Sequence, residues 1–544
     1  MYPLKLRVFA ILLSWCLLAG CRLGDPAVDR YGQNARAFWW GKIQDDRTAI
    51  KILKEEAASW KTAPDGLDRY GGTLDSPVFQ ATGHFRTQKV SGRWWLITPE
   101  GHRFYSIGVD LISAAHATVI TGRRGQFKAL PASTRDGSLY YTYDPYDHTR
   151  QMFDFYRANL DRFHDPSSGM RPLDAWRDRV HRRLNDWGFN TIGNWSERKL
   201  REAGRLPYTT GVTLFEPTYR VRGETDFLDV PTFGSGKYRF ADVFSPRYRK
   251  HALEYGGVFS DPGTRRSALD PWCIGVFADN EIPWTGGLPA ERHALTRAIF
   301  AKDAPAAAKK AFWRRLEERY GDLPGINAAW DTSFSGSITD LAARSVTLPE
   351  NENDALKKDL EDLTGFFAER YFSTVRKAFH RHMPWSLYLG SRFDAGTPQV
   401  VRNVAGRSMD VISVNTYERD VAAAPHIRVP VDKPLLVSEF HFGATDQGAL
   451  HGGVITVRTQ KKRAIAYTAF AESVLRDPSF VGFHWFQYVD QPMTGRTMDG
   501  EDFNCGLVNT LDLPYSELTR AARVFNRSVY DRLAKEPKKD ENRP

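Results

Sequence analysis

The sequence predicts an α/β protein folded as a (β/α)8 TIM barrel, with loop insertions and an N-terminal extension of β-hairpin and helical character. Short apolar, β-branched or aromatic runs ending in polar residues recur along the chain, and segments of crossover length separate them. Near-continuous apolar runs are typical of strands buried on both faces of a parallel sheet. The eight runs are 104–110, 189–194, 211–215, 273–280, 386–391, 410–415, 434–440 and 481–486.

Two of the segments between these runs have the apolar spacing of helices, as the crossover connections of a parallel sheet require. Residues 173–187 carry apolar side chains near 3.6 spacing, and 360–382 reads as a second helix. A doubly wound open sheet is the alternative architecture. The chain has no G-x-G-x-x-G or G-x-x-x-x-G-K-[ST] motif to anchor that alternative.

The first twenty residues predict an export signal. Lys5 and Arg7 precede an apolar run over 8–18, which is too short to span a bilayer comfortably. The run leads into Leu-Ala-Gly-Cys ending at Cys21, which resembles the lipobox of bacterial lipoproteins. That resemblance implies a signal peptide over 1–20, a diacylated Cys21 and, with Arg22 next, the outer membrane of a Gram-negative cell. An ordinary signal peptide followed by a chance cysteine is the alternative.

Three further segments follow the leader. Residues 21–82 form an extension with helical patches, 83–530 the barrel domain, and 531–544 a charged tail that we expect to be disordered. At the start of the barrel domain, 83–106 alternates polar and apolar residues around Ser91-Gly92. This pattern predicts a β-hairpin, which we expect to cap the barrel floor.

Composition narrows the function classes. Lys and Arg number 75 against 65 Asp and Glu, a net charge of +10, but both signs are interleaved along the chain. This balance predicts a solvated surface and no nucleic-acid partner. The four cysteines show no C-x-x-C spacing, which argues against structural zinc and dithiol chemistry. Aromatic residues, 13% of the chain, suit a protein that stacks sugar rings.

Two of the predicted strands end in a glutamate, Glu281 on the fourth run and Glu439 on the seventh. Catalytic residues of TIM barrels sit at the carboxyl ends of the strands, and strands four and seven lie across the mouth from one another. Retaining glycoside hydrolysis needs one carboxylic acid to protonate the leaving oxygen and one carboxylate to attack the anomeric carbon. The pattern therefore predicts a retaining glycosidase, although a lone strand-end glutamate is more often a cap or a surface residue.

Neighbouring residues suggest which glutamate does what. Asn280 offers an amide to a sugar hydroxyl beside Glu281, and Tyr417 is placed to donate a hydrogen bond that keeps Glu439 ionised. We therefore expect Glu439 to be the nucleophile. Burial and the nearby anion should raise the pKa of Glu281, as an acid/base residue needs.

Longer stretches resemble the family 50 glycoside hydrolases, the β-agarases, within the clan A barrels. The likeness covers about residues 83 to 520, and its most specific motifs are 438–453 and 482–509. Shorter motifs lie at 91–110, 188–196, 275–284 and 388–393. The resemblance implies Glu281 as acid/base, Glu439 as nucleophile, and no cofactor.

The resemblance also implies a substrate. Members of this family cleave β-1,4 linkages of agarose with retention, commonly releasing neoagarobiose from chain ends, so we expect a galactan or agaro-oligosaccharide substrate and exo action. The residues it places in sugar subsites are Asn194, Trp195, Asn280, Arg392, Tyr417, His441, Trp485, Gln487 and Asp490. Trp485 is the expected stacking platform. Since a lone histidine beside a carboxylate is usually a hydrogen-bond donor, His441 predicts no metal site.

Alternatives stay open at this point. Another clan A β-galactosidase or β-glycosidase would share the chemistry, and a surface glycan-binding lipoprotein without activity would share the fold. About 60 residues separate Cys21 from the first motif, too few for the β-sandwich that precedes the barrel in the agarases, so oligosaccharides rather than long chains are a further possibility. The sugar, the endo or exo mode and the oligomeric state are not fixed by the sequence.

Overall fold

The computed structural model describes residues 27–75, 78–131, 140–215, 227–231, 237–253, 259, 261–286, 292–424 and 427–535. The predicted signal peptide and the predicted lipidation site at Cys21 lie outside these residues. Within the described ranges, no helix combines the length and the apolar character needed to cross a membrane.

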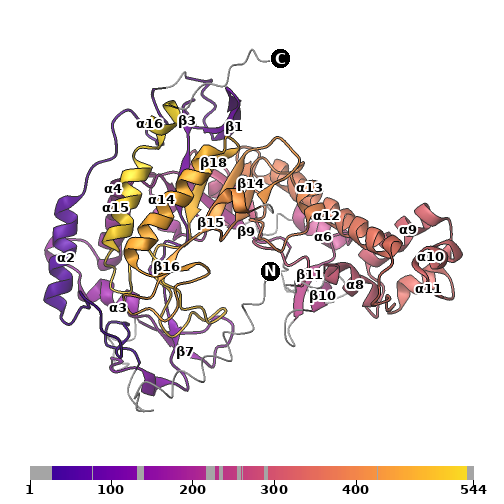
Figure 1. Cartoon of the computed structure of the whole chain (residues 1–544), viewed down its shortest axis with the longest axis horizontal. Helices are drawn as coiled ribbons and strands as arrows, with labels where there is room; N and C mark the ends of the chain where they lie inside the picture. The colour runs from indigo at the N-terminus through magenta and orange to yellow at the C-terminus, as the bar shows by residue number, and fades with distance from the viewer. Residues whose placement is uncertain are drawn as a thin grey trace.

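Eight parallel strands form the central sheet and follow one another around it in chain order (Figure 1). They are β4 (Ser106–Val109), β8 (Thr191–Ile192), β9 (Tyr208–Val212), β12 (Cys273–Ala278), β13 (Leu387–Tyr388), β14 (Ile412–Asn415), β15 (Leu435–Phe440) and β18 (Phe480–Trp485). The backbone N–H of Phe393, beyond β13, donates to the carbonyl of Ser413 in β14 at 3.0 Å, which joins the two ends of the sheet. The predicted (β/α)8 architecture is confirmed.

The strands differ from the predicted runs mainly in length. β8 keeps only two residues of its run, and β9 begins at Tyr208, earlier than the predicted 211–215. Thr209 and Thr210 lie inside β9 and interrupt the apolar pattern, although Thr209 is fully buried. A hydroxyl residue inside a strand therefore hid the start of the third strand from sequence reading.

Helices surround the sheet on its outer face. Helix α4 (Pro172–Trp187) begins with proline in its first turn and ends at Gly188 in the left-handed conformation. The second predicted helix is longer than expected, since α12 runs over Asp354–His382 behind an Asn353 cap. The other helices in this layer are α5 (Arg198–Arg201), α6 (Pro246–Leu253), α7 (Pro262–Ser267), α13 (Gln399–Ala405), α14 (Gln460–Arg476) and α15 (Ser516–Asn526).

A three-stranded antiparallel sheet closes the amino end of the barrel. It comprises β1 (Arg86–Val90), β2 (Arg93–Ile97) and β3 (Arg103–Phe104), and its first turn has positive φ at Ser91 and Gly92. Its apolar face packs against residues at the starts of barrel strands, in a cluster that includes Phe85, Leu96, Phe104, Ile274, Val411, Leu436 and Val481. The predicted hairpin and its place at the barrel floor are confirmed.

Most insertions follow the carboxyl ends of strands. A small sheet of β5 (Thr118–Val119), β6 (Tyr141–Tyr143) and β7 (Gln151–Phe153) follows the first strand, the hairpin β10 (Phe227–Pro231) and β11 (Lys237–Ala241) the third, and β16 (Gly443–Ala444) with β17 (Thr456–Val457) the seventh. After the fourth come α8 (Ala294–Ala301), α9 (Ala307–Tyr320), α10 (Leu323–Trp330) and α11 (Ile338–Ala343). The last three project to one side, next to the far end of α12 (Figure 1).

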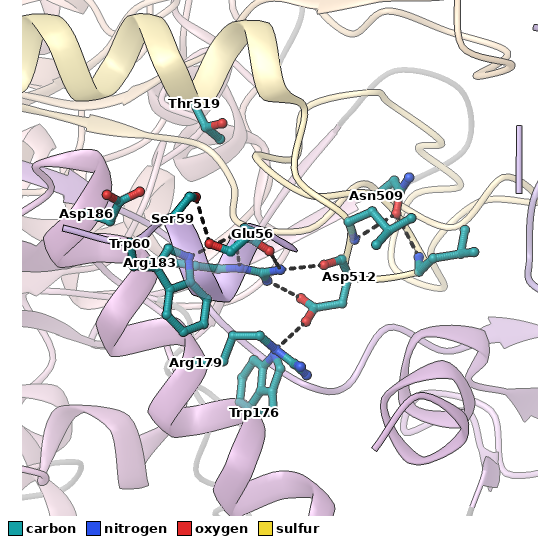
Figure 2. Close-up of polar contacts among 12 residues, drawn as sticks. Glu56, Ser59, Trp60, Trp176, Arg179, Arg183, Asp186, Asn509, Asp512 and Thr519 are labelled. Atoms are coloured by element: carbon teal, nitrogen blue, oxygen red, sulfur yellow. Dashed lines mark hydrogen bonds and ion pairs between the residues drawn. The ribbon is translucent and has the colours of Figure 1, made fainter. Parts of the chain in front are cut away.

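The N-terminal extension is tied to the barrel by a buried ionic network (Figure 2). Helix α2 (Asp46–Ser59) carries Glu56, whose two oxygens accept from the guanidinium of Arg183 on α4 at 2.8 and 2.7 Å. The same guanidinium donates to Asp512 at 2.7 Å, and Arg179 pairs with the other oxygen of Asp512. Arg183 is fully buried, and the carboxylates of Glu56 and Asp512 supply the charge that matches its own.

The C-terminal end corrects one boundary. Helix α16 (Val529–Ala534) continues into the predicted tail of 531–544, and Tyr530 donates to the carbonyl of Gly71 at 2.8 Å. Residues 536–544 lie outside the described residues. Cys273 and Cys505 are both buried free thiols.

Candidate active site

Glu439 lies within the seventh barrel strand and is held by two donors. The guanidinium of Arg392 donates to its Oε1 at 2.6 Å, and the hydroxyl of Tyr417 donates to its Oε2 at 2.6 Å. Tyr417 follows the sixth strand and Arg392 the fifth, so three consecutive strands converge on one carboxylate. The predicted hydrogen bond from Tyr417 to Glu439 is confirmed.

Glu281 lies three residues beyond the fourth strand and has a weaker set of partners. Its Oε1 accepts from the amide of Asn415 at 2.9 Å, and the same amide lies 3.2 Å from Oδ1 of Asn280. The Asn280 oxygen also accepts from Nε of Arg392 at 2.8 Å. A continuous set of hydrogen bonds therefore links Glu281 to Glu439 through two amides and one guanidinium.

Arg392 organises the centre of this arrangement. It is fully buried, and besides Glu439 it pairs with Asp110 at 2.7 Å, a carboxylate that follows the first strand and is equally buried. Its guanidinium lies 4.5 Å from the ring centroid of Trp195 and 4.8 Å from that of Phe277. A buried cation is tolerated only where anions match it, and here two carboxylates do so.

The two glutamates have unequal electrostatics. Burial, and next the charge of Glu439, raise the pKa of Glu281 to about 8. Burial also raises the pKa of Glu439, but the positive charge of Arg392 and the hydrogen bond from Tyr417 oppose that rise. Because Glu439 has a cation and a phenol as partners and Glu281 only an amide, Glu439 is the member of the pair that holds the negative charge. Near neutral pH, Glu281 keeps its proton.

Backbone strain gathers at the same strand ends. Leu111, Trp195, Asp279, Glu281 and Arg392 all have positive φ values, between 45° and 62°, although none is glycine. They follow the first, second, fourth and fifth strands. Such conformations cost about 1–2 kcal/mol each, and they persist where surrounding contacts fix a side chain in a required direction.

The other predicted subsite residues divide into two groups, of which the first lies at the glutamates. Trp195 is 43% exposed, so its ring is open to a ligand. Asn194 is buried with its backbone N–H on Asp110, and its Oδ1 has no partner among the described residues. The same holds for Nη1 of Arg392. Both atoms are enclosed by the protein, in contrast to the exposed ring of Trp195.

The second group lies inside the protein. Trp485 is fully buried, donates to the carbonyl of Cys505 at 2.8 Å and packs on Phe440 and Tyr467, so its prediction as a stacking platform is wrong. The carboxylate of Asp490 accepts hydrogen bonds from Asn504, Tyr515 and the backbone N–H of Gly506. These bonds use the carboxylate to connect loops of the protein.

Gln487 and His441 are also enclosed. Gln487 donates to the carbonyl of Val489 at 2.6 Å, and its Oε1 is buried without a described partner. The ring of His441 packs edge-on against Tyr417 at 4.9 Å, and its Nε2 accepts from the backbone of Val454 at 3.1 Å. His441 therefore supports Tyr417 from behind.

Sequence reading missed two residues at the centre of the site, Asp110 and Asn415. Both close a predicted strand run, and their polar side chains at those ends were the available signal. Asp394 and Glu501 are two further acids nearby, since Asp394 helps to raise the pKa of Glu281 and Glu501 that of Tyr417. Glu501 pairs with Arg496 at 2.8 Å on the loop after strand eight.

A possible ligand set for a metal lies elsewhere in the described chain. Asp68, Glu100 and His102 come together beside the floor hairpin. One oxygen of Asp68 already accepts from Thr98 and His102, and the other from the backbone of Tyr70 and Gly72. Because its oxygens already accept these hydrogen bonds, Asp68 has a structural role in stabilising the turn.

Comparisons with known proteins show which family the chain resembles over its length. No protein-family model matches the chain. The curated beta-agarase B of Vibrio sp. (strain JT0107) is 32% identical over 538 residues, covering 93% of this chain and 55% of the relative. Beta-agarase A of the same strain is 33% identical over 539 residues, 92% of this chain and 52% of its own length. The chain thus spans about half the length of the curated relatives it matches.

Solved structures extend the likeness to the fold. The crystal structure of an agarase, AgWH50C, matches with a TM-score of 0.81 at 30% identity, covering 93% of this chain and 74% of the other. On this similarity over most of both chains, the chain belongs to the family 50 glycoside hydrolases, the family of the β-agarases.

Proposed function

We propose that the chain hydrolyses β-1,4-galactosidic linkages of agarose or agaro-oligosaccharides with retention of anomeric configuration. The observation that carries the proposal is the pair of strand-end glutamates in unequal surroundings, one matched by a cation and a phenol, the other protonated by burial. That difference is what acid and nucleophile require of two carboxyl groups. A pure glycan receptor has no need of it.

The reaction proceeds in two displacements. In the first, the ionised carboxylate of Glu439 attacks the anomeric carbon while Glu281 gives its proton to the departing glycosidic oxygen. A covalent glycosyl ester on Glu439 results. In the second, Glu281, now ionised, takes a proton from water, whose oxygen attacks the same carbon and releases Glu439. Arg392 and Tyr417 stabilise Glu439 whenever it carries charge.

The substrate proposal rests on the relatives. Two are named beta-agarases, and a further structure, described as an exo-beta-agarase, matches with a TM-score of 0.82 at 28% identity over 93% of this chain and 73% of the other. We therefore propose exo action on agarose-type galactans. The exposed ring of Trp195 beside the glutamates suits the stacking of one galactose unit.

A product profile tests the proposal. The protein is incubated with agarose, neoagaro-oligosaccharides and aryl β-glycosides, and products are separated over time. Neoagarobiose as the main product from the first time points supports exo agarase action. Activity confined to aryl glycosides or other galactans would keep the two-glutamate chemistry and remove agarose as the substrate.

We also propose that the chain is exported and held at the outer membrane by lipid on Cys21. This rests on the leader sequence, with its basic start, short apolar run and Leu-Ala-Gly-Cys end. A surface anchor suits an enzyme whose polymeric substrate cannot enter the cell.

A further inference from the structure

A surface groove lies at the amino ends of the fourth and fifth barrel strands. Its volume is about 310 Å³, near the lower end of the range for small-ligand pockets. Residues 268–271 form one wall just before β12, residues 385–386 another just before β13, and residues 82–84 a third at the start of the floor hairpin. Three separate segments therefore build one hollow.

This groove is remote from the glutamates. Glu281 follows the carboxyl end of β12, whereas Asp270 and Pro271 precede its amino end. The strand has six residues, which at about 3.3 Å each places the two ends roughly 20 Å apart. The groove and the active site thus lie at opposite ends of the same strand.

Two aromatic rings, those of Trp385 and His84, form one side of the groove. The indole of Trp385 is 56% exposed, and the ring of His84 lies 5.1 Å from it at an angle of 45°. Leu269, on the facing wall, is 79% exposed. Large apolar side chains left in water inside a concave site indicate a ligand with flat apolar faces.

The remaining lining mixes the polar side chains of Thr82, Asp270 and Ser386 with Gly83, Ala268 and Pro271, and it carries little free charge. The carboxylate of Asp270 accepts from the hydroxyl of Tyr208 and from the backbone of Trp272, both at 3.0 Å. Burial lowers the pKa of His84, so this ring is neutral at pH 7. Thr82 and Ser386 add hydroxyls to the lining. Such a lining suits an uncharged, hydroxyl-rich ligand better than a phosphate or an acidic peptide.

We propose that this groove is a second saccharide-binding site, which holds a neutral galactan segment by stacking one sugar ring on Trp385 while other parts of the polymer reach the active site. The substrate class rests on the proposed function, and the site itself rests on the groove. Its effect is to keep the enzyme on a solid polysaccharide between cleavage events.

Binding is tested with the full chain carrying Glu439→Gln, so that the matrix is not digested. Its retardation in native gels containing soluble low-melting agarose is compared with that of the same chain carrying Trp385→Ala, Trp385→Phe or Val524→Ala. Val524, 67% exposed on α15, is a matched surface control. We expect Trp385→Ala to bind about two- to ten-fold more weakly, and the other two variants to behave like the parent.

A parallel measurement uses the active chain. With Trp385→Ala we expect unchanged kcat/KM on a soluble neoagaro-oligosaccharide and slower release of sugar from agarose particles. Equal retardation of the parent and Trp385→Ala, or no retardation of the parent, overturns the second site even where hydrolysis is normal. A change in sedimentation coefficient with Trp385→Ala assigns the groove to contact between two copies and also overturns it. Failure to hydrolyse any galactan instead overturns the proposed function.

Discussion

Replacing Tyr417 with phenylalanine removes one of the two donors that hold Glu439 as an anion. The hydroxyl lies 2.6 Å from Oε2, and Arg392 holds only the other oxygen. A hydrogen bond to a charged group contributes about 1.5–3 kcal/mol, which corresponds to about a 10- to 150-fold loss in kcat/KM. Because Arg392 stays in place, we expect activity to fall without disappearing.

The pH profile gives the sharper readout of this change. The hydroxyl stabilises the ionised form, so its loss raises the pKa of Glu439, and the nucleophile then loses its charge at a higher pH. The same energy corresponds to an upward move of the acid limb by about 1–2 pH units. Tyr320→Phe, which removes a hydroxyl donating to Asp359 at 2.8 Å in the helical insertion, serves as the control. An acid limb that stays in place in Tyr417→Phe refutes the reasoning that Tyr417 maintains the nucleophile.

Three further outcomes are expected. Activity should fall as pH rises through about 8, since Glu281 must be protonated to act as an acid. Glu281→Gln should remove this alkaline limb of the pH profile and should retain activity only on aryl glycosides with good leaving groups. Arg183→Met should lower the free energy of unfolding in urea by about 3–5 kcal/mol, because it leaves the carboxylate of Glu56 without its cation and that of Asp512 with Arg179 alone. The exposed neighbour variant Arg182→Met should change it by less than about 0.5 kcal/mol. Cys21→Ser should abolish incorporation of labelled fatty acid and release the protein from membrane fractions, whereas persistent labelling argues against the lipid anchor.

The barrel was predictable because its strands are buried on both faces. Near-continuous apolar runs give a strong signal for such strands, and polar residues at their ends mark the catalytic rim. The Glu281 and Glu439 positions followed from this logic. Asp110 and Asn415 also close strand runs, so these two residues at the centre of the site could have been predicted from the sequence.

The same continuity explains the error at Trp485. A run without polar alternation does not reveal which residues face the barrel interior, because side chains simply alternate between the two faces. In the structure His484 faces Ser106 and Asp110, whereas Trp485 faces α14 through Tyr467. A shift of one residue along the strand thus separates a side chain that faces the barrel interior from one that packs against the outer helices. The groove at Trp385 gave no sequence signal, since its walls come from three distant segments.

Azide rescue of the two alanine variants, followed by proton NMR of the products, tests the two-glutamate mechanism most directly. With a β-linked aryl substrate, azide replaces the lost nucleophile in Glu439→Ala and attacks from its face, so we predict an α-glycosyl azide. In Glu281→Ala the glycosyl ester on Glu439 still forms, and azide opens it from the opposite face to give a β-glycosyl azide. The reverse pair of products would exchange the two roles, and an absence of rescue in both variants would contradict the double displacement.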